Sequence, residues 1–243
     1  MSSEANLIVG IPLYQQCTLM DFAGATQVFG APFGFQPIWI SNEEKIVTSE
    51  GVTVIPNYNF KNCPPVDILF IPGGSAQSSL NSPLDGVPAA MQNKDLLDFI
   101  FKTSKTTLWN GSVCTGAFIL AAAGILKNSL ATTYWSQIPT LKLLASSYNL
   151  KIPEGYPRFL FDDKNKIFTG GGISSSIDLS LEIVRKIKGK EVAEMTQLFI
   201  QYQPKPSTNS GDPAHAPENI TKELTESGME YTQVMVQAVE KLV

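Results

Sequence analysis

Residues 106–124 have the sequence TTLWNGSVCTGAFILAAAG, and this stretch decides the predicted fold. Its first part is rich in β-branched and aromatic residues, whereas its second part is a run of small and apolar residues that favours a helix. Cys114 lies at the junction, between Gly111 and Gly116, where a strand is predicted to turn sharply into a helix. A side chain on such a turn stands clear of the top of the sheet, which is where a nucleophile is commonly placed.

The start of the predicted helix also affects the charge of Cys114. The free N–H groups there carry about half a positive charge, which stabilises a nearby anion by about 0.3–2 kcal/mol. At about 1.36 kcal/mol per pKa unit, this effect lowers the pKa of a thiol by up to about 1.5. We therefore expect part of Cys114 to be the nucleophilic thiolate at neutral pH. The alternative is that Cys114 is a small buried hydrophobic residue, as most free cysteines are.

On both sides of this segment, short apolar runs bounded by Gly or Pro alternate with helical stretches. This pattern predicts an α/β fold, a three-layer sandwich with a mostly parallel sheet and helices on both faces. Hairpins are predicted around Glu50–Gly51 and around residues 163–166, and serine caps are expected to begin the helix that Gly189 ends. The other predicted strands lie at 7–13, 36–41 and 67–74, and the predicted helices at 21–30, 93–105, 174–189 and 190–201.

The length of 243 residues and the hydrophobic content of 43% favour one domain over residues 1–243. The stretch QPKPSTNSGDPAHAPEN, residues 203–219, is rich in proline and polar residues, so it is predicted to form a long surface arm. A C-terminal helix is predicted near 229–243.

Charge and composition narrow the function. The net charge is −4 and the lysines are scattered, so no nucleic-acid partner is expected. The N-terminus has no secretory pattern and no apolar run is long enough to span a membrane, which predicts a cytoplasmic protein without a membrane partner. Three cysteines and one histidine favour neither a disulfide framework nor a metal site. Cys17 and Cys63 are expected to be structural thiols, and His215 an ordinary solvated or interface residue.

Four motifs in order carry a resemblance to a known family: FIPGG at 70–74, SVCTG at 112–116, ATTYW at 131–135 and TGGGISSSIDLSLEIV at 169–184. Over residues 7–203 the chain resembles the ThiJ/PfpI superfamily, and within it the isonitrile (isocyanide) hydratases. The resemblance implies a flavodoxin-like sandwich, a homodimer, a small-molecule substrate, and neither a metal nor an organic cofactor.

The resemblance also implies roles for residues of the site. Cys114 is the nucleophile, and Asp21, in the segment LMDFAGATQVFG, is the acidic partner. Thr115 stands where superfamily members proposed as proteases have histidine, so the imidazole base is missing there. Tyr134 stands where hydratases commonly have histidine in a run similar to ATTHW. If that histidine shapes the choice of substrate, the substrate here differs.

These residues suit the hydration of an isonitrile, whose carbon must receive both a nucleophile and a proton. If Asp21 lies beside Cys114, the two groups repel each other as anions and share one proton. We expect Cys114 to attack the carbon, Asp21 to protonate it, and the resulting carboxylate to activate water. Thr115 is expected to donate to the sulfur, and the backbone N–H groups of Gly74 and Ser75 to hold a water molecule or a developing negative charge.

Several alternatives remain open. Asp21 can serve only to begin the first helix, and Gly73–Gly74 can be only a tight turn. Gly170–Gly172 is interpreted as a close-packing segment. The competing functions are glyoxalase or deglycase chemistry on reactive carbonyls, and a redox or stress-response role in which Cys114 is oxidised. A ligand-sensing transcription regulator is less favoured, because the residues after Gln203 are too few for a pair of helix-turn-helix motifs.

Overall fold

The computed structural model describes residues 6–75 and 84–243, and its centre is a six-stranded sheet. The strand order is β2-β1-β5-β6-β8-β7, and every neighbouring pair is parallel except β7 and β8. A separate antiparallel hairpin joins β3 to β4. The bounds are β1 Leu7–Pro12, β2 Phe35–Ile40, β3 Ile46–Val47, β4 Thr53–Val54, β5 Ile68–Ile71, β6 Trp109–Ser112, β7 Phe159–Asp162 and β8 Ile167–Gly170.

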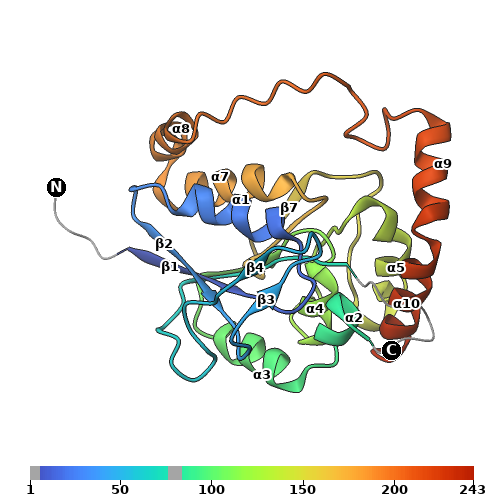
Figure 1. Ribbon diagram of the computed structural model, residues 1–243, viewed down its shortest axis with the longest axis horizontal. Coiled ribbons are helices and arrows are strands. Elements are labelled where there is room, and N and C mark those ends of the chain that lie inside the picture. The colour runs from blue at the N-terminus through green and yellow to red at the C-terminus, as the bar shows by residue number, and fades with distance from the viewer. Residues whose placement is uncertain (1–5, 76–83) are drawn as a thin grey trace.

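Helices cover both faces of the sheet (Figure 1). Helices α1 (Leu19–Phe29) and α7 (Ser175–Lys188) lie on one face, whereas α2 (Gly86–Ala90), α3 (Lys94–Thr103) and α4 (Gly116–Ala122) lie on the other. The predicted α/β three-layer sandwich is therefore confirmed, as are both predicted hairpins. The remaining elements are η1 Trp135–Gln137, α5 Ile138–Lys142, α6 Ala145–Tyr148, α8 Lys190–Phe199, α9 Glu218–Ser227 and α10 Met229–Glu240.

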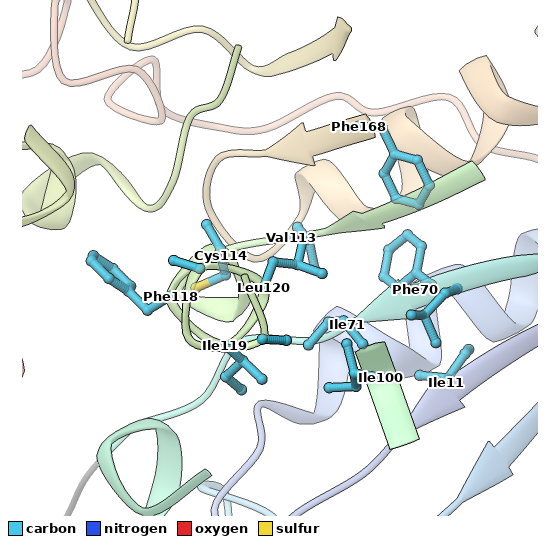
Figure 2. Close-up of a cluster of buried hydrophobic side chains, with 14 of the residues drawn as sticks. Ile11, Phe70, Ile71, Ile100, Val113, Cys114, Phe118, Ile119, Leu120 and Phe168 are labelled. Atoms are coloured by element: carbon cyan, nitrogen blue, oxygen red, sulfur yellow. The ribbon is translucent and has the colours of Figure 1, made fainter. Parts of the chain in front are cut away.

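The core follows from the sequence of the central strands. All four residues of β5, Ile-Leu-Phe-Ile, are buried, because helices cover both faces of a central parallel strand. Figure 2 shows Phe70 and Phe168 packed against each other, with Phe118, Ile119 and Leu120 of α4 in the same cluster. Burial of each such side chain contributes about 1.5–3 kcal/mol. Cys114 lies at the edge of this cluster, at the start of α4 (Figure 2).

Close packing of α7 against α1 fixes the position of the first turn of α1. A Cβ atom on Gly24 would lie 2.5 Å from Oγ of Ser176, so a side chain at this position would displace the Ser176 hydroxyl. The Ser176 hydroxyl also donates to the carbonyl oxygen of Met20, over 3.1 Å. The expected serine cap of α7 is wrong: Ser174 occupies the N-cap position, but its Oγ accepts a hydrogen bond from Arg158 instead of capping the helix.

The C-terminal part differs in one respect from the prediction. The polar arm leads along one side of the molecule to α9 and α10 (Figure 1), but α9 already begins at Glu218, inside the predicted arm. The predicted C-terminal helix is confirmed as α10, which is anchored by four buried side chains and by a hydrogen bond of 2.8 Å from Gln137 Nε2 to Thr232 Oγ1. The buried residues are Val234, Met235, Ala238 and Val239.

Candidate active site

Cys114 lies on a strained turn between β6 and α4. Its φ is +57°, in the left-handed region that side chains other than glycine seldom adopt, at a cost of about 1–3 kcal/mol. Hydrogen bonds from neighbouring loops hold this conformation: the Cys114 N–H donates to the carbonyl oxygens of Gly170 (3.1 Å) and Gly171 (2.7 Å). The Thr133 hydroxyl donates to the Cys114 carbonyl oxygen over 2.8 Å. The predicted strand-to-helix turn is thus present and over-determined.

Asp21 lies in the first turn of α1 and is completely buried. Its Oδ2 accepts a hydrogen bond of 2.8 Å from the N–H of Gly73, 52 residues away in sequence. The N–H of Leu19, at the start of the helix, is satisfied instead by Oε2 of Glu50, at 2.9 Å. The Asp21 carboxyl therefore does not cap its own helix, and it faces the loop after β5.

Gly73 brings Asp21 and Cys114 together. A Cβ atom at this position would lie 2.7 Å from the Cβ of Cys114, 2.7 Å from the backbone nitrogen of Thr115 and 2.8 Å from Oδ2 of Asp21. No side chain fits between these groups, so glycine is required for the close approach of the acid to the thiol. The Oδ1 atom of Asp21 is buried and has no hydrogen-bond partner within the described part of the chain.

Burial dominates the protonation of both groups. It raises the pKa of Asp21 to about 8, although hydrogen bonds from the Gly73 N–H and from Cys114 lower it. The pKa of Cys114 is raised well above its ordinary value, first by burial and then by the charge of Asp21. Each buried anion disfavours the other, so the pair holds at least one proton at neutral pH. The expectation that the helix start alone makes Cys114 partly ionised is wrong, because desolvation outweighs it.

Thr115 opposes the rise in the pKa of Cys114. Its backbone N–H and its hydroxyl both lower the pKa of the Cys114 thiol. The Thr115 Oγ1 lies 4.0 Å from Sγ of Cys114 and 2.9 Å from the carbonyl oxygen of Gly74. The hydroxyl predicted to donate to the sulfur therefore lies at the limit of hydrogen-bond reach of it.

The prediction for the amides of Gly74 and Ser75 is wrong. The Gly74 N–H donates to Thr115 Oγ1 over 3.1 Å, and the Ser75 N–H donates to the carbonyl oxygen of Gln16 over 3.1 Å. Both donors are used inside the protein, so neither is open to a substrate oxygen in this conformation. The Gly73–Gly74 segment instead forms part of the scaffold, because Gly74 makes an antiparallel bridge with Cys17.

Two tyrosines near the thiol do not belong to any motif identified in the sequence. The Tyr231 hydroxyl, on α10, donates to the carbonyl oxygen of Gly74 over 3.1 Å, and the Tyr14 hydroxyl donates to that of Pro72 over 3.0 Å. Burial raises the pKa values of both hydroxyls, and both lie close enough to Cys114 and Asp21 for these charges to raise them further. A signal for Tyr231 exists in the sequence: it lies four residues before buried Met235, on the apolar face of its helix.

A cavity of about 580 Å³ lies beside the turn. Tyr134 links it to the thiol, because this side chain lines the cavity and is close enough to Cys114 for the thiolate charge to raise its pKa, in addition to burial. Most of the lining is aromatic or apolar, and its charged side chains are Arg158, which is paired with Asp178, and Asp212. The lining residues are Met20, Thr133, Tyr134, Trp135, Tyr156, Pro157, Arg158, Gly171, Gly172, Ile173, Ser174, Gly211, Asp212 and Pro213.

Comparison with known proteins identifies the family of the chain. Residues 9–186 match the model of the DJ-1/PfpI family. The chain belongs to the DJ-1/PfpI family. It is 31% identical over 219 residues to an isonitrile hydratase from Pseudomonas putida, a match that covers 89% of this chain and 88% of that protein.

Two further proteins are similar to this DJ-1/PfpI protein. A crystal structure of a ThiJ/PfpI family protein from Pseudomonas syringae superimposes with a TM-score of 0.85 at 26% identity, covering 97% of this chain and 91% of that one. The HTH-type transcriptional regulator GbdR from Pseudomonas aeruginosa is 23% identical over 162 residues, which are 64% of this chain but only 38% of the regulator.

The other residues singled out in the sequence analysis lie away from the thiol of this DJ-1/PfpI protein or have a packing role. His215 lies in the arm, 3.3 Å from Asp212, with 68% of its side chain exposed. Burial raises the pKa of Cys17 to about 12, although backbone hydrogen bonds of Tyr14 and Cys17 lower it, and burial raises the pKa of Cys63 to about 11. A Cβ on Gly170 would lie 3.0 Å from Leu179, which agrees with a packing role.

Within residues 6–75 and 84–243, no His, Cys, Asp or Glu side chains form a group of three that could hold a metal ion. No helix in the same residues is long and apolar enough to cross a membrane.

Proposed function

We propose that this protein is an isonitrile hydratase-like enzyme, a lyase that converts an isocyanide and water into an N-substituted formamide through a thioimidate on Cys114. The observation that carries the proposal is the meeting of the Asp21 carboxyl and the Cys114 thiol across Gly73. The similarity to the Pseudomonas putida isonitrile hydratase over most of both chains supports the same chemistry.

The reactive form of the pair holds one proton, on Asp21, after the thiol proton has left to solvent. In the first half-reaction, the Cys114 thiolate of this form attacks the isocyanide carbon and Asp21 gives its proton to that carbon. The product is a thioimidate, with one new C–S bond and one new C–H bond, and Asp21 becomes a carboxylate. A pKa of about 8 for Asp21 suits this step, because the carboxyl holds a proton at neutral pH. The buried Oδ1 of Asp21, which has no partner in the described residues, is the atom best placed to carry it.

In the second half-reaction, the Asp21 carboxylate takes one proton from water while the water oxygen attacks the thioimidate carbon. The nitrogen receives the second proton of that water, and the C–S bond breaks to release the formamide and the thiolate. The hydroxyl and N–H of Thr115 stabilise the sulfur anion each time it forms. The aromatic cavity beside Tyr134 receives the organic group of the substrate.

The test is incubation of the purified protein with an aryl isocyanide, with the formamide measured by chromatography. We expect turnover by the wild type, loss of at least about 10³-fold for Cys114→Ser, and an unchanged fold by circular dichroism. Cys63→Ser is the matched control, because Cys63 is a half-buried thiol outside the site, and it should keep full activity. Absence of formamide with a folded wild-type protein would contradict the proposal.

The same preparations separate the competing functions. Consumption of methylglyoxal that depends on Cys114 would indicate glyoxalase or deglycase chemistry. Conversion of Cys114 to a sulfinate by mild peroxide, without turnover of either substrate, would indicate a redox role.

We further propose that the protein acts in the cytoplasm without a nucleic-acid partner, and that it is a homodimer without a cofactor, as the family resemblance implies for these last two properties. Light scattering coupled to gel filtration measures the oligomeric state. A mass equal to one chain, 26.4 kDa, would contradict the dimer.

A further inference from the structure

Two hydroxyl groups share one carbonyl oxygen beside the thiol. The Gly74 oxygen accepts from Thr115 Oγ1 at 2.9 Å and from Tyr231 Oη at 3.1 Å. Gly74 is buried, so its carbonyl oxygen must be satisfied by protein donors.

The Thr115 hydroxyl has a single hydrogen and three acceptors within reach: the Gly74 oxygen, the hydroxyl oxygen of Tyr231, and the Cys114 sulfur, which lies at 4.0 Å. When the sulfur is neutral, the Gly74 oxygen is the better acceptor. When the sulfur becomes an anion, the hydrogen gains more by turning to it, because hydrogen bonds to charged groups are stronger. That turn removes one of the two hydrogen bonds to the buried Gly74 oxygen.

We propose that Tyr231 is a positioning residue that sets the reactivity of Cys114 through Thr115. By holding the Gly74 carbonyl oxygen, Tyr231 allows the Thr115 hydroxyl to turn to the thiolate without leaving that oxygen unpaired. Without Tyr231, the same rotation of the Thr115 hydroxyl leaves the buried Gly74 oxygen without a hydrogen bond, which opposes formation of the thiolate.

The position of Tyr231 is fixed by the helix that carries it. The buried side chains of α10 and the hydrogen bond from Gln137 to Thr232 anchor the helix one residue away from Tyr231. The C-terminal helix, far from Cys114 in the sequence, thereby completes the surroundings of the thiol. The ionisable groups that face the thiol are Asp21, Tyr14, Tyr134 and Tyr231.

The proposal rests on Cys114 as the nucleophile of the proposed function, but alkylation tests it without any isocyanide. The rate at which iodoacetamide modifies Cys114 is measured by peptide mass spectrometry across a pH series. For Tyr231→Phe we expect the midpoint of the pH profile to rise by about 0.5–1, which slows modification about 3- to 10-fold at any pH below the midpoint. The rate above the midpoint should be unchanged.

A double-variant comparison separates this route from a direct effect. In a Thr115→Val background there is no hydroxyl to turn, so adding Tyr231→Phe should produce no further shift. In a Thr115→Ser background the hydroxyl is restored, and the Tyr231→Phe shift should return. Tyr148→Phe is the matched control, because the Tyr148 hydroxyl also donates to a buried carbonyl, that of Ala121 in α4, over 3.2 Å. Its profile for Cys114 should equal the wild type.

An unchanged midpoint in Tyr231→Phe would overturn the proposal, as would a shift that persists in the Thr115→Val background. Melting temperatures show whether each variant is folded at the assay temperature. Tyr231→Met provides a second variant without the hydroxyl, and it should give the same shift. Loss of isocyanide turnover alone bears on the proposed function and leaves the alkylation result intact.

Discussion

The central feature at the residue scale is a carboxyl group that is buried beside a thiol. Asp21 is completely buried, receives one backbone N–H from Gly73, and faces Cys114. An acid in this position is costly for folding and useful for proton transfer, because desolvation keeps it protonated near neutral pH. Both consequences can be measured on the same variant.

Asp21→Asn should lower the rate of isocyanide hydration by about 10²- to 10⁴-fold, because asparagine cannot deliver a proton to the isocyanide carbon. The amide oxygen of the substituted side chain can still accept from the Gly73 N–H, so the loop after β5 should stay in place. Alkylation of Cys114 should persist in this variant, since the nucleophile remains. Equal loss of alkylation and turnover would show that Asp21 acts on the structure of the turn and not on the substrate.

The same variant should change how stability depends on pH. Folded Asp21 keeps its proton up to about pH 8, whereas an ordinary aspartate releases it near pH 3.8. The stabilising effect of the folded, protonated acid is complete below about pH 3.8 and is lost as the pH rises towards 8. Asp21→Asn should therefore gain stability over the wild type across this range, by up to about 6 kcal/mol, with a constant difference above about pH 8. Urea unfolding at several pH values measures this difference in the free energy of unfolding. If the free energies of the two proteins changed in parallel with pH, the burial of a protonated Asp21 would be contradicted.

At the scale of single elements, the loop after β5 controls the distance between the Asp21 carboxyl and the Cys114 thiol. Gly73→Ala should reduce turnover by at least about 10²-fold, because the new methyl group would lie 2.7 Å from Cys114 Cβ and from the Thr115 nitrogen. The clash involves backbone, so it cannot be relieved by rotating a side chain. Rates of turnover and melting curves check this together, and an active, equally stable variant would show that the acid and the thiol tolerate separation.

The sequence predicted the elements that carry strong hydrophobic patterns, and it missed those that tertiary contacts define. The run ILFI and the turn around Cys114 were identifiable, because buried parallel strands and Gly-flanked junctions have local signatures. Helix α9 was missed because all of its residues remain at least partly exposed and it follows a proline-rich stretch. The short helices α2, α5 and α6 have too few residues for a periodic pattern.

For the site, the sequence predicted which residues lie close together. It did not predict the hydrogen-bond partner of each backbone amide. The proximity of Asp21 to Cys114 was predicted from the family resemblance. In the structure, the packing of α1 against α7 holds Asp21 in its position. The amides of Gly74 and Ser75 were assigned to the substrate, yet their partners, Thr115 and Gln16, become evident only in three dimensions. Tyr231 was missed because its helix follows a long irregular arm that has no fixed spacing to the sheet.

At the scale of the whole molecule, the arm forms part of the cavity beside Tyr134. Gly211, Asp212 and Pro213 line the cavity, and the chain then continues into α9 and α10 (Figure 1). These three residues are in position to contact the organic group of a substrate and not the reacting carbon.

Replacement of residues 211–213 by Ser-Gly-Ser should therefore raise the KM for an aryl isocyanide several-fold and change kcat by less than about 2-fold. Steady-state kinetics measure both constants. Since the replacement keeps the length of the connection, α10 and Tyr231 should keep their positions, and the alkylation profile of Cys114 serves as the control. A fall in kcat with an unchanged KM would contradict the assignment of the arm to substrate binding.

The left-handed backbone at Cys114 has a consequence for heat tolerance. Glycine adopts a φ of +57° without steric cost, so the inactive substitution Cys114→Gly relaxes the turn while the hydrogen bonds from Thr133 and to Gly170 and Gly171 stay available. A laboratory selection that rewards only survival at high temperature would then favour chains that have lost their chemistry at this position, and a selection on turnover would have to work against that tendency.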